Sequence, residues 1–148
     1  MTTLVVDASV ILKWRLDDED AVPQAVALKE DFVETNFLEL IAPTLAPYEI
    51  ANGLHQAARR GRITANNALE SLSDILALHI ELSPSDLLAT LRIAQALDIS
   101  AIYDAAYVAL AETEDCEFWT GDRRRFNSLH SKWPRIRWIG DYASPESR

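Results

Sequence analysis

Short apolar runs alternate along this chain with longer segments in which apolar residues recur at helical spacing. Runs of strand length occupy residues 4–6, 38–42, 79–82, 117–120 and 135–139. Between them, apolar residues recur every three or four positions. Strands that alternate with helices are typical of parallel sheets, whose crossover connections are helical. The pattern predicts a three-layer α/β/α domain with a mostly parallel central sheet.

One such domain accounts for residues 1–148. The chain is 49% hydrophobic and contains no repeat, long linker or low-complexity tract. A single cysteine, Cys116, excludes an internal disulfide framework and suits a reducing cytosol. No apolar run approaches the roughly 20 residues that cross a bilayer, and no basic region followed by a long apolar stretch opens the chain. We therefore expect a cytoplasmic protein without membrane association.

Four acidic residues stand where a strand ends or a helix begins. Asp7 and Asp122 follow two of the apolar runs, and Glu49 and Asp104 lie near the starts of predicted helices. In an open parallel sheet the active crevice lies beyond the carboxyl ends of the strands, so this fold can bring all four acids to one edge. Because a carboxylate in an apolar setting is costly unless it is paired or binds a cation, a shared metal ion is the simplest explanation. Oxygen-only ligands favour Mg²⁺ or Mn²⁺ over Zn²⁺.

Each acid also has a purely structural interpretation. Asp7 can bond backbone amides in a turn, Asp104 can stabilise a helix terminus, and Asp122 can cap the arginine-rich helix that follows it. The conjunction of the acids favours a metal site, in which mutual repulsion should raise some of their pKa values. Such sites catalyse in-line phosphoryl displacement by water. No glycine-rich phosphate loop or serine nucleophile elbow is present, which disfavours ATP-dependent and serine-based chemistry.

The net charge of −9 argues against nucleic-acid binding, but the distribution of charge weakens that objection. Residues 116–148 hold seven Lys or Arg and four acids, so residues 1–115 carry −12. Bound divalent cations would reverse the local field at the acids. Two basic clusters are candidate RNA contacts, with solvated helix ends as the alternative interpretation: Arg59, Arg60, Arg62, Arg123, Arg124 and Arg125.

The motifs around the four acids resemble those of PIN-domain ribonucleases, and specifically those of VapC-type toxins of bacterial and archaeal toxin–antitoxin pairs. The resemblance covers essentially the full length. It rests on residues 5–14 (VVDASVILKW), 49–52 (EIAN), 103–111 (YDAAYVALA) and 119–126 (WTGDRRRF). It implies a PIN-like fold and a Mg²⁺- or Mn²⁺-dependent endoribonuclease.

The resemblance also implies roles for particular residues. The acidic quartet of the family falls on Asp7, Glu49, Asp104 and Asp122, which we expect to be catalytic. Asp7, Asp104 and Asp122 are the expected metal ligands, and Glu49 is expected to hold a second ion or to orient the water. The small polar supporting positions of the family fall on Ser9, Asn52 and Thr120.

The partners implied by the resemblance are RNA, a small cognate antitoxin and a second copy of the chain. Val10, Ile11 and Trp14 could line a groove for an amphipathic antitoxin helix, or could belong to the core. The leucine-rich helices predicted within residues 64–97 are the candidate dimer surface.

Two other functions remain open. One is a haloacid-dehalogenase-like or other Mg²⁺ phosphohydrolase in which Asp7 is the nucleophile. Those enzymes normally carry a second Asp two residues later, where this chain has Ser9. The other is a catalytically silent PIN-like binding module, against which the complete acidic quartet counts.

Overall fold

Five strands form one all-parallel sheet in the order β3-β2-β1-β4-β5. The computed structural model describes residues 1–145, so the end of the predicted domain at residues 146–148 lies outside the described part. The strands are β1 (Thr2–Val6), β2 (Leu38–Pro43), β3 (Glu81–Ser83), β4 (Glu117–Thr120) and β5 (Ile136–Trp138). The predicted parallel sheet is confirmed.

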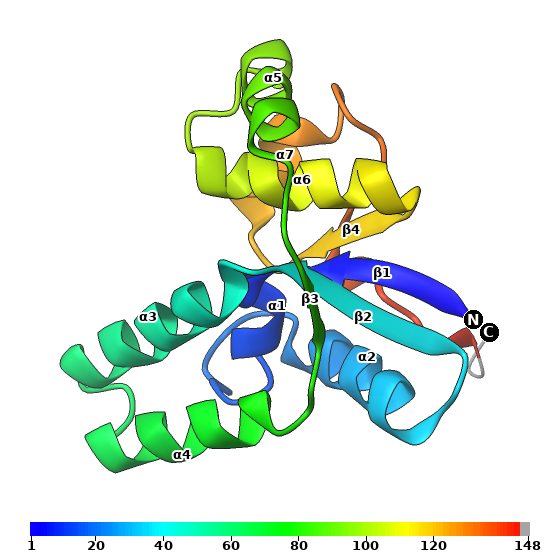
Figure 1. Cartoon of the computed structure of the whole chain (residues 1–148). Helices are drawn as coiled ribbons and strands as arrows, with labels where there is room; N and C mark the ends of the chain where they lie inside the picture. The colour runs from blue at the N-terminus through cyan, green and yellow to red at the C-terminus, as the bar shows by residue number, and fades with distance from the viewer. Residues whose placement is uncertain (146–148) are drawn as a thin grey trace.

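Helices cover both faces of this sheet (Figure 1), which confirms the three-layer prediction. One face carries α1 (Ala8–Leu12), α2 (Val22–Glu34), α3 (Ala46–Arg59) and α4 (Ala65–Leu76). The other carries α5 (Leu87–Leu97), α6 (Ile102–Glu114) and α7 (Arg123–Leu129), and a short 3-10 helix, Ile139–Asp141, follows β5. Within residues 1–145 no single helix is long and apolar enough to cross a membrane. Only α5 and α6 taken together pass that test, and they are bent by 106°.

Each face of the sheet has its own core, because consecutive residues of a strand point to opposite sides. Leu4 and Val6 of β1 pack with α1, α2 and α3, whereas Val5 packs with α6 and the region around α7. Residues 4–6 of β1 are buried on both faces of the sheet, which is why they are apolar at consecutive positions and show no polar alternation.

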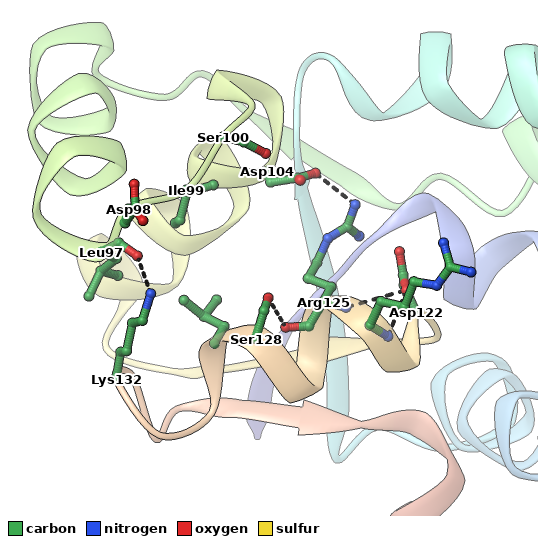
Figure 2. A pocket seen from close by; sticks show the side chains of 11 residues that line it. Leu97, Asp98, Ile99, Ser100, Asp104, Asp122, Arg125, Ser128 and Lys132 are labelled. Carbon is green, nitrogen blue, oxygen red and sulfur yellow. Dashed lines mark hydrogen bonds and ion pairs between the residues drawn. The ribbon is translucent and has the colours of Figure 1, made fainter.

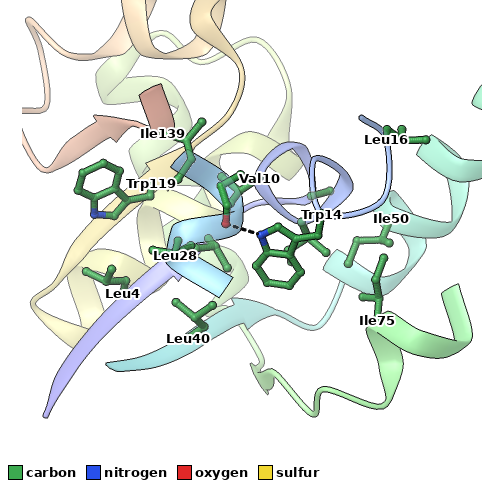
Figure 3. Packing of buried hydrophobic residues seen from close by; sticks show 14 of the residues in the cluster. Leu4, Val10, Trp14, Leu16, Leu28, Leu40, Ile50, Ile75, Trp119 and Ile139 are labelled. Carbon is green, nitrogen blue, oxygen red and sulfur yellow. Dashed lines mark hydrogen bonds between the residues drawn. The ribbon is translucent and has the colours of Figure 1, made fainter. Parts of the chain in front are cut away.

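The first core also contains Val10, Ile11 and Trp14. Figure 3 shows Val10 and Trp14 within it. All three are buried, and the Trp14 indole N–H donates to the carbonyl oxygen of Ala25 in α2 at 2.9 Å. The hypothesis that these residues form an antitoxin groove is therefore wrong, because their side chains are occupied in packing α1 onto α2 and the sheet.

The sheet register brings the ends of β1 and β4 together. Val6 pairs with Trp119, so the turns that follow the two strands lie side by side. The first turns of α3 and α6 contain Glu49 and Asp104, and Asp122 is the N-cap of α7. Strand ends and helix starts thus meet at the carboxyl edge of the sheet, where the sequence predicts the site.

Candidate functional site

Asp7 lies at the centre of the site and is only 1% exposed. As the N-cap of α1, its Oδ1 accepts hydrogen bonds from the Val10 backbone N–H at 3.2 Å and from the Ser9 hydroxyl at 2.5 Å. Its Oδ2 accepts from the Thr120 hydroxyl at 2.6 Å and pairs with the Arg125 guanidinium. Burial of this carboxylate is tolerable because both oxygens are bonded. The capping interpretation of Asp7 is correct, and it coexists with a place in the acidic site.

Ser9 and Thr120, two of the predicted supporting residues, tie the turn after β1 to the turn after β4. Ser9 Oγ accepts from the Gly121 N–H at 2.8 Å, and Thr120 Oγ1 accepts from the Asp122 N–H at 3.1 Å. A Cβ atom on Gly121 would lie 2.9 Å from the Ser9 carbonyl oxygen, so the close approach of the two turns requires glycine.

Asn52, the third predicted supporting residue, is not part of this network. It is exposed on α3, one turn beyond Glu49, and forms no hydrogen bond with another residue of the described chain. The helical spacing relates Asn52 to Glu49, but the structure does not bring its amide to the acids.

Arg125 joins the carboxylates of Asp7 and Asp104 (Figure 2 shows the Asp104 contact). One terminal nitrogen, Nη1, pairs with Asp7 Oδ2, and the other, Nη2, donates to Asp104 Oδ1 at 2.7 Å. Asp122 caps α7 by accepting from the backbone N–H groups of Arg124 and Arg125 at 3.0 and 3.3 Å. Burial opposes the charge of Arg125, but the charges of the three aspartates outweigh it and raise the pKa of the guanidinium.

Glu49 is half-buried and accepts a hydrogen bond from the Tyr107 hydroxyl at 2.7 Å through Oε1. Burial raises the pKa of Glu49 and outweighs the opposing effects of Tyr107 and Arg125. The charges of Asp7 and Asp104 raise it further. The predicted repulsion between the carboxylates therefore contributes to the raised pKa of Glu49, although desolvation contributes more.

Tyr107 is a site residue that the sequence did not single out. Its pKa is raised, first by burial and then by the nearby carboxylates, so the phenol stays protonated and acts as a donor. Its spacing from Asp104, one helical turn later in α6, is the signal that could have identified it.

The donors assembled here are carboxylate oxygens supported by hydroxyls, which are the hard ligands that Mg²⁺ and Mn²⁺ prefer. Within residues 1–145, however, no three His, Cys, Asp or Glu side chains stand close enough to hold a metal ion as they are placed. The Arg125 guanidinium bridges Asp7 and Asp104 and thereby separates their carboxylates. The donor chemistry fits a divalent cation, and the space between two of the donors is occupied by Arg125.

A cavity of about 380 Å³ opens beside these carboxylates (Figure 2). This volume is in the range of small-ligand sites. Asp98, Asp104 and Asp122 contribute the acidic part of its lining, and Arg124, Arg125 and Lys132 contribute the basic part. The remaining lining residues are uncharged: Leu97, Ile99, Ser100, Ser128 and Leu129.

Two of the six candidate RNA-binding arginines are exposed beside the site and form no ion pair within residues 1–145. Arg123 is exposed and stacks on Trp138, with its Cζ 3.9 Å from the ring centroid. Arg124 is exposed and lines the cavity. Arg125 also lines the cavity, but its guanidinium is paired with the acids rather than presented to solvent.

The other basic cluster lies away from the acids. Arg59 and Arg60 are exposed at the C-terminus of α3, about 15 Å along the helix from Glu49. Arg62 pairs with Asp18 at 2.6 Å and with Glu19 at 2.9 Å, so its charge is compensated within the chain.

The raised pKa of Glu49 predicts a pH-dependent effect on stability. Folded Glu49 binds its proton more tightly than unfolded Glu49, so the free energy of unfolding falls as the pH rises from the unfolded pKa through the folded pKa. In EDTA, Glu49→Gln should therefore melt above the parent protein at about pH 8 and level with it at about pH 4. Thermal melts between about pH 4 and about pH 8 test this expectation, with Glu70→Gln at an exposed position of α4 as the control. If the melting-temperature difference between Glu49→Gln and the parent grew as the pH fell, the raised pKa of Glu49 would be contradicted.

Known proteins resemble this chain in sequence and in fold. A family model described as the PIN domain matches residues 4–130. Ribonuclease VapC3 of Pyrobaculum aerophilum is 33% identical over 90% of this chain and 96% of its own length. Ribonuclease VapC9 of Mycobacterium tuberculosis is also 33% identical, over 88% of this chain and 94% of its own.

Two solved structures share the fold. The crystal structure of PAE2754 from Pyrobaculum aerophilum has a TM-score of 0.66 and 24% identity, covering 93% of this chain and 91% of that one. That of Mycobacterium tuberculosis VapC20, described as a sarcin–ricin loop cleaving toxin, has a TM-score of 0.59 and 11% identity, covering 84% and 94%. The family match and the VapC relatives confirm the resemblance seen in the motifs: this chain belongs to the PIN-domain family and is related to the VapC ribonucleases.

Proposed function

We propose that this chain is a Mg²⁺- or Mn²⁺-dependent endoribonuclease and the toxin of a VapC-type toxin–antitoxin pair. The observation that carries the proposal is the convergence of Asp7, Asp104 and Asp122 on Arg125 at the carboxyl edge of the sheet, with Glu49 in the same electrostatic field. Relatives that are named ribonucleases support hydrolysis of RNA as the reaction.

A divalent ion held by these carboxylates would lower the pKa of a water molecule and stabilise charge on the phosphate. Asp7 and Asp104 would be its principal ligands, and Asp122 would complete the set directly or through water. Ser9 and Thr120 orient the two oxygens of Asp7, which limits the rearrangement needed for binding.

Glu49 would orient the attacking water and accept its proton. Tyr107 bonds Oε1 of Glu49, which leaves Oε2 available to the water. The raised pKa of this carboxyl makes it a better proton acceptor than an ordinary glutamate.

The rival functions have less structural support. A nucleophilic Asp7 would need a free oxygen, whereas both oxygens of Asp7 are bonded and the side chain is buried. Ser9, in place of a second Asp, serves to hold Asp7. A silent binding module does not explain why Asp104 and Asp122 line an open cavity while Asp7 pairs with the same arginine as Asp104.

Loss of a metal ligand should abolish cleavage without unfolding the protein. Asp7→Asn and Asp104→Asn remove one charge each at nearly constant volume, and each should lower the Mn²⁺-dependent cleavage rate by at least about a hundredfold, since even supporting residues of metal sites can cost that much. Cleavage of a labelled RNA measures the rate, and circular dichroism measures folding. Asp74→Asn, on exposed α4, is the matched control. A double variant that cuts as fast as the parent, with contaminating nuclease excluded, contradicts the proposal.

The arginines beside the site should bind RNA phosphate. Each phosphate contact releases counterions, so Arg123→Gln and Arg124→Gln should each weaken binding and reduce the magnitude of the salt slope of the association constant by about one. Fluorescence anisotropy in EDTA measures binding without cleavage. Arg62→Gln should leave the slope unchanged, because Asp18 and Glu19 already compensate Arg62. Equal slopes in the parent and the first two variants would mean that Arg123 and Arg124 are ordinary solvated cations.

We further propose a homodimer that uses α5. The candidate surface within residues 64–97 is divided by the fold, since α4 packs beside α3 and α5 packs on α6, on opposite sides of the sheet (Figure 1). On α5 three leucines at helical spacing are exposed: Leu87, Leu88 and Leu91. A cluster of exposed leucines on one helix is typical of an interaction surface.

The leucines of α5 predict an oligomerisation defect in a single variant. Leu88→Ser should shift the mass of the parent dimer toward the monomer in light scattering, because it puts a polar group into an apolar contact. Leu69→Ser, at an equally exposed position on α4, should keep the parent mass. A parent protein that is monomeric at all concentrations would contradict the dimer.

We also propose that a small antitoxin binds this chain, because the chain resembles VapC toxins.

A further inference from the structure

Arg125 is the one residue of the described chain that forms ion pairs with the acids of the site. The other ion pairs of residues 1–145 involve different carboxylates. The planar guanidinium uses its two terminal nitrogens on two separate carboxylates, a geometry for which arginine is better suited than lysine. It therefore occupies the space between Asp7 and Asp104.

We propose that Arg125 is a built-in counter-cation that competes with the divalent ion for Asp7 and Asp104. Metal loading then requires the guanidinium to leave these carboxylates, and Arg125 sets the metal affinity of the site. This inference rests on the proposed function, because it concerns the same acids. In the loaded enzyme the displaced guanidinium would face the RNA phosphate in the adjacent cavity.

The need for a cation follows from the burial of Asp7. A carboxylate that is 1% exposed is costly when its cationic partner is removed. The hydroxyls of Ser9 and Thr120 satisfy its hydrogen-bonding capacity but leave its charge uncompensated. Arg125 compensates that charge in the structure, and a divalent ion would compensate it more strongly and also draw Asp104 inward.

The surroundings of Arg125 permit the exchange. Only the two terminal nitrogens hold the guanidinium, since its buried Nε has no hydrogen-bond partner within the described chain. An unpaired buried donor costs free energy, so the inward position is incompletely satisfied. Arg125 also lines the cavity of about 380 Å³, together with Arg124 and Lys132. Open space therefore lies beside its present position, and the cations Arg124 and Lys132 stand within the lining of that space as candidate phosphate contacts.

Competition has a quantitative consequence. The apparent dissociation constant for the metal equals the intrinsic constant divided by the fraction of molecules in which Arg125 has left the acids. If that fraction is about one in ten or lower, removing the guanidinium tightens metal binding by about tenfold or more.

Calorimetric titration of Mn²⁺ into three proteins tests this inference: the parent, Arg125→Gln and Arg124→Gln. The Arg124 variant is a matched control, because it removes the same charge from the adjacent position of α7 but no ion pair with the site acids. We expect Arg125→Gln to bind Mn²⁺ about tenfold or more tightly than Arg124→Gln. Without the ion, Arg125→Gln should melt below Arg124→Gln, and saturating Mn²⁺ should remove most of that difference, because the guanidinium has then left the acids in the control protein as well.

If Arg125→Gln does not fold without metal, Arg125→Lys replaces it in the titration. Lysine keeps the charge but cannot bridge both carboxylates, so its Mn²⁺ affinity should still exceed that of Arg124→Gln. Equal affinities of the Arg125 and Arg124 variants overturn the inference, and if the parent still cuts RNA with Mn²⁺ the nuclease assignment stands. A parent that neither binds Mn²⁺ nor cuts RNA overturns both.

Discussion

The burial of Asp7 is the constraint on which the rest of the site depends. A carboxylate in the centre of an α/β domain must be fully bonded, and its partners come from segments far apart in the sequence. Ser9 and Thr120 fix the turns after β1 and β4 against each other, and Gly121 permits their close approach. Arg125, at the start of α7, adds the compensating charge. The same contacts that make Asp7 tolerable therefore assemble the acidic edge of the sheet.

Helix starts supply the other acids. Glu49 and Asp104 occupy the first turns of α3 and α6, and Asp122 is the N-cap of α7. Carboxylates at these positions are favoured by the helix dipole and by free backbone N–H groups. This explains how several negative charges can gather without unfolding the domain. At Asp122 the capping and metal-binding interpretations are compatible, because the cap uses Oδ1 and leaves Oδ2 available. At Asp7 both oxygens are bonded, so a metal ion would have to replace Arg125 on Oδ2.

Much of the fold could be predicted from the sequence, because strands buried on both faces and amphipathic helices leave strong periodic signals. The positions of Asp7, Glu49, Asp104 and Asp122 at strand ends and helix starts follow from the same reading. The bond between Tyr107 and Glu49 and the bridge made by Arg125 could not be predicted, because they depend on side-chain directions across tens of residues. Asn52 is predicted as a supporting residue from the family resemblance, and it lies one turn beyond Glu49 on the same helix. That spacing does not bring its amide into contact with the acids, because the side chain is exposed on α3. The separation of α4 from α5 depends on the path of β3 between them.

The central claim is that Asp7 and Asp104 form a divalent-metal site whose resting cation is Arg125. The most direct measurement is a crystal structure of the protein at saturating Mn²⁺, with anomalous data to locate the ion. We expect an anomalous peak bonded to both carboxylates and an Arg125 guanidinium turned into the adjacent cavity. An ion bound elsewhere, or carboxylates of Asp7 and Asp104 still paired with Arg125 at saturating Mn²⁺, would contradict it.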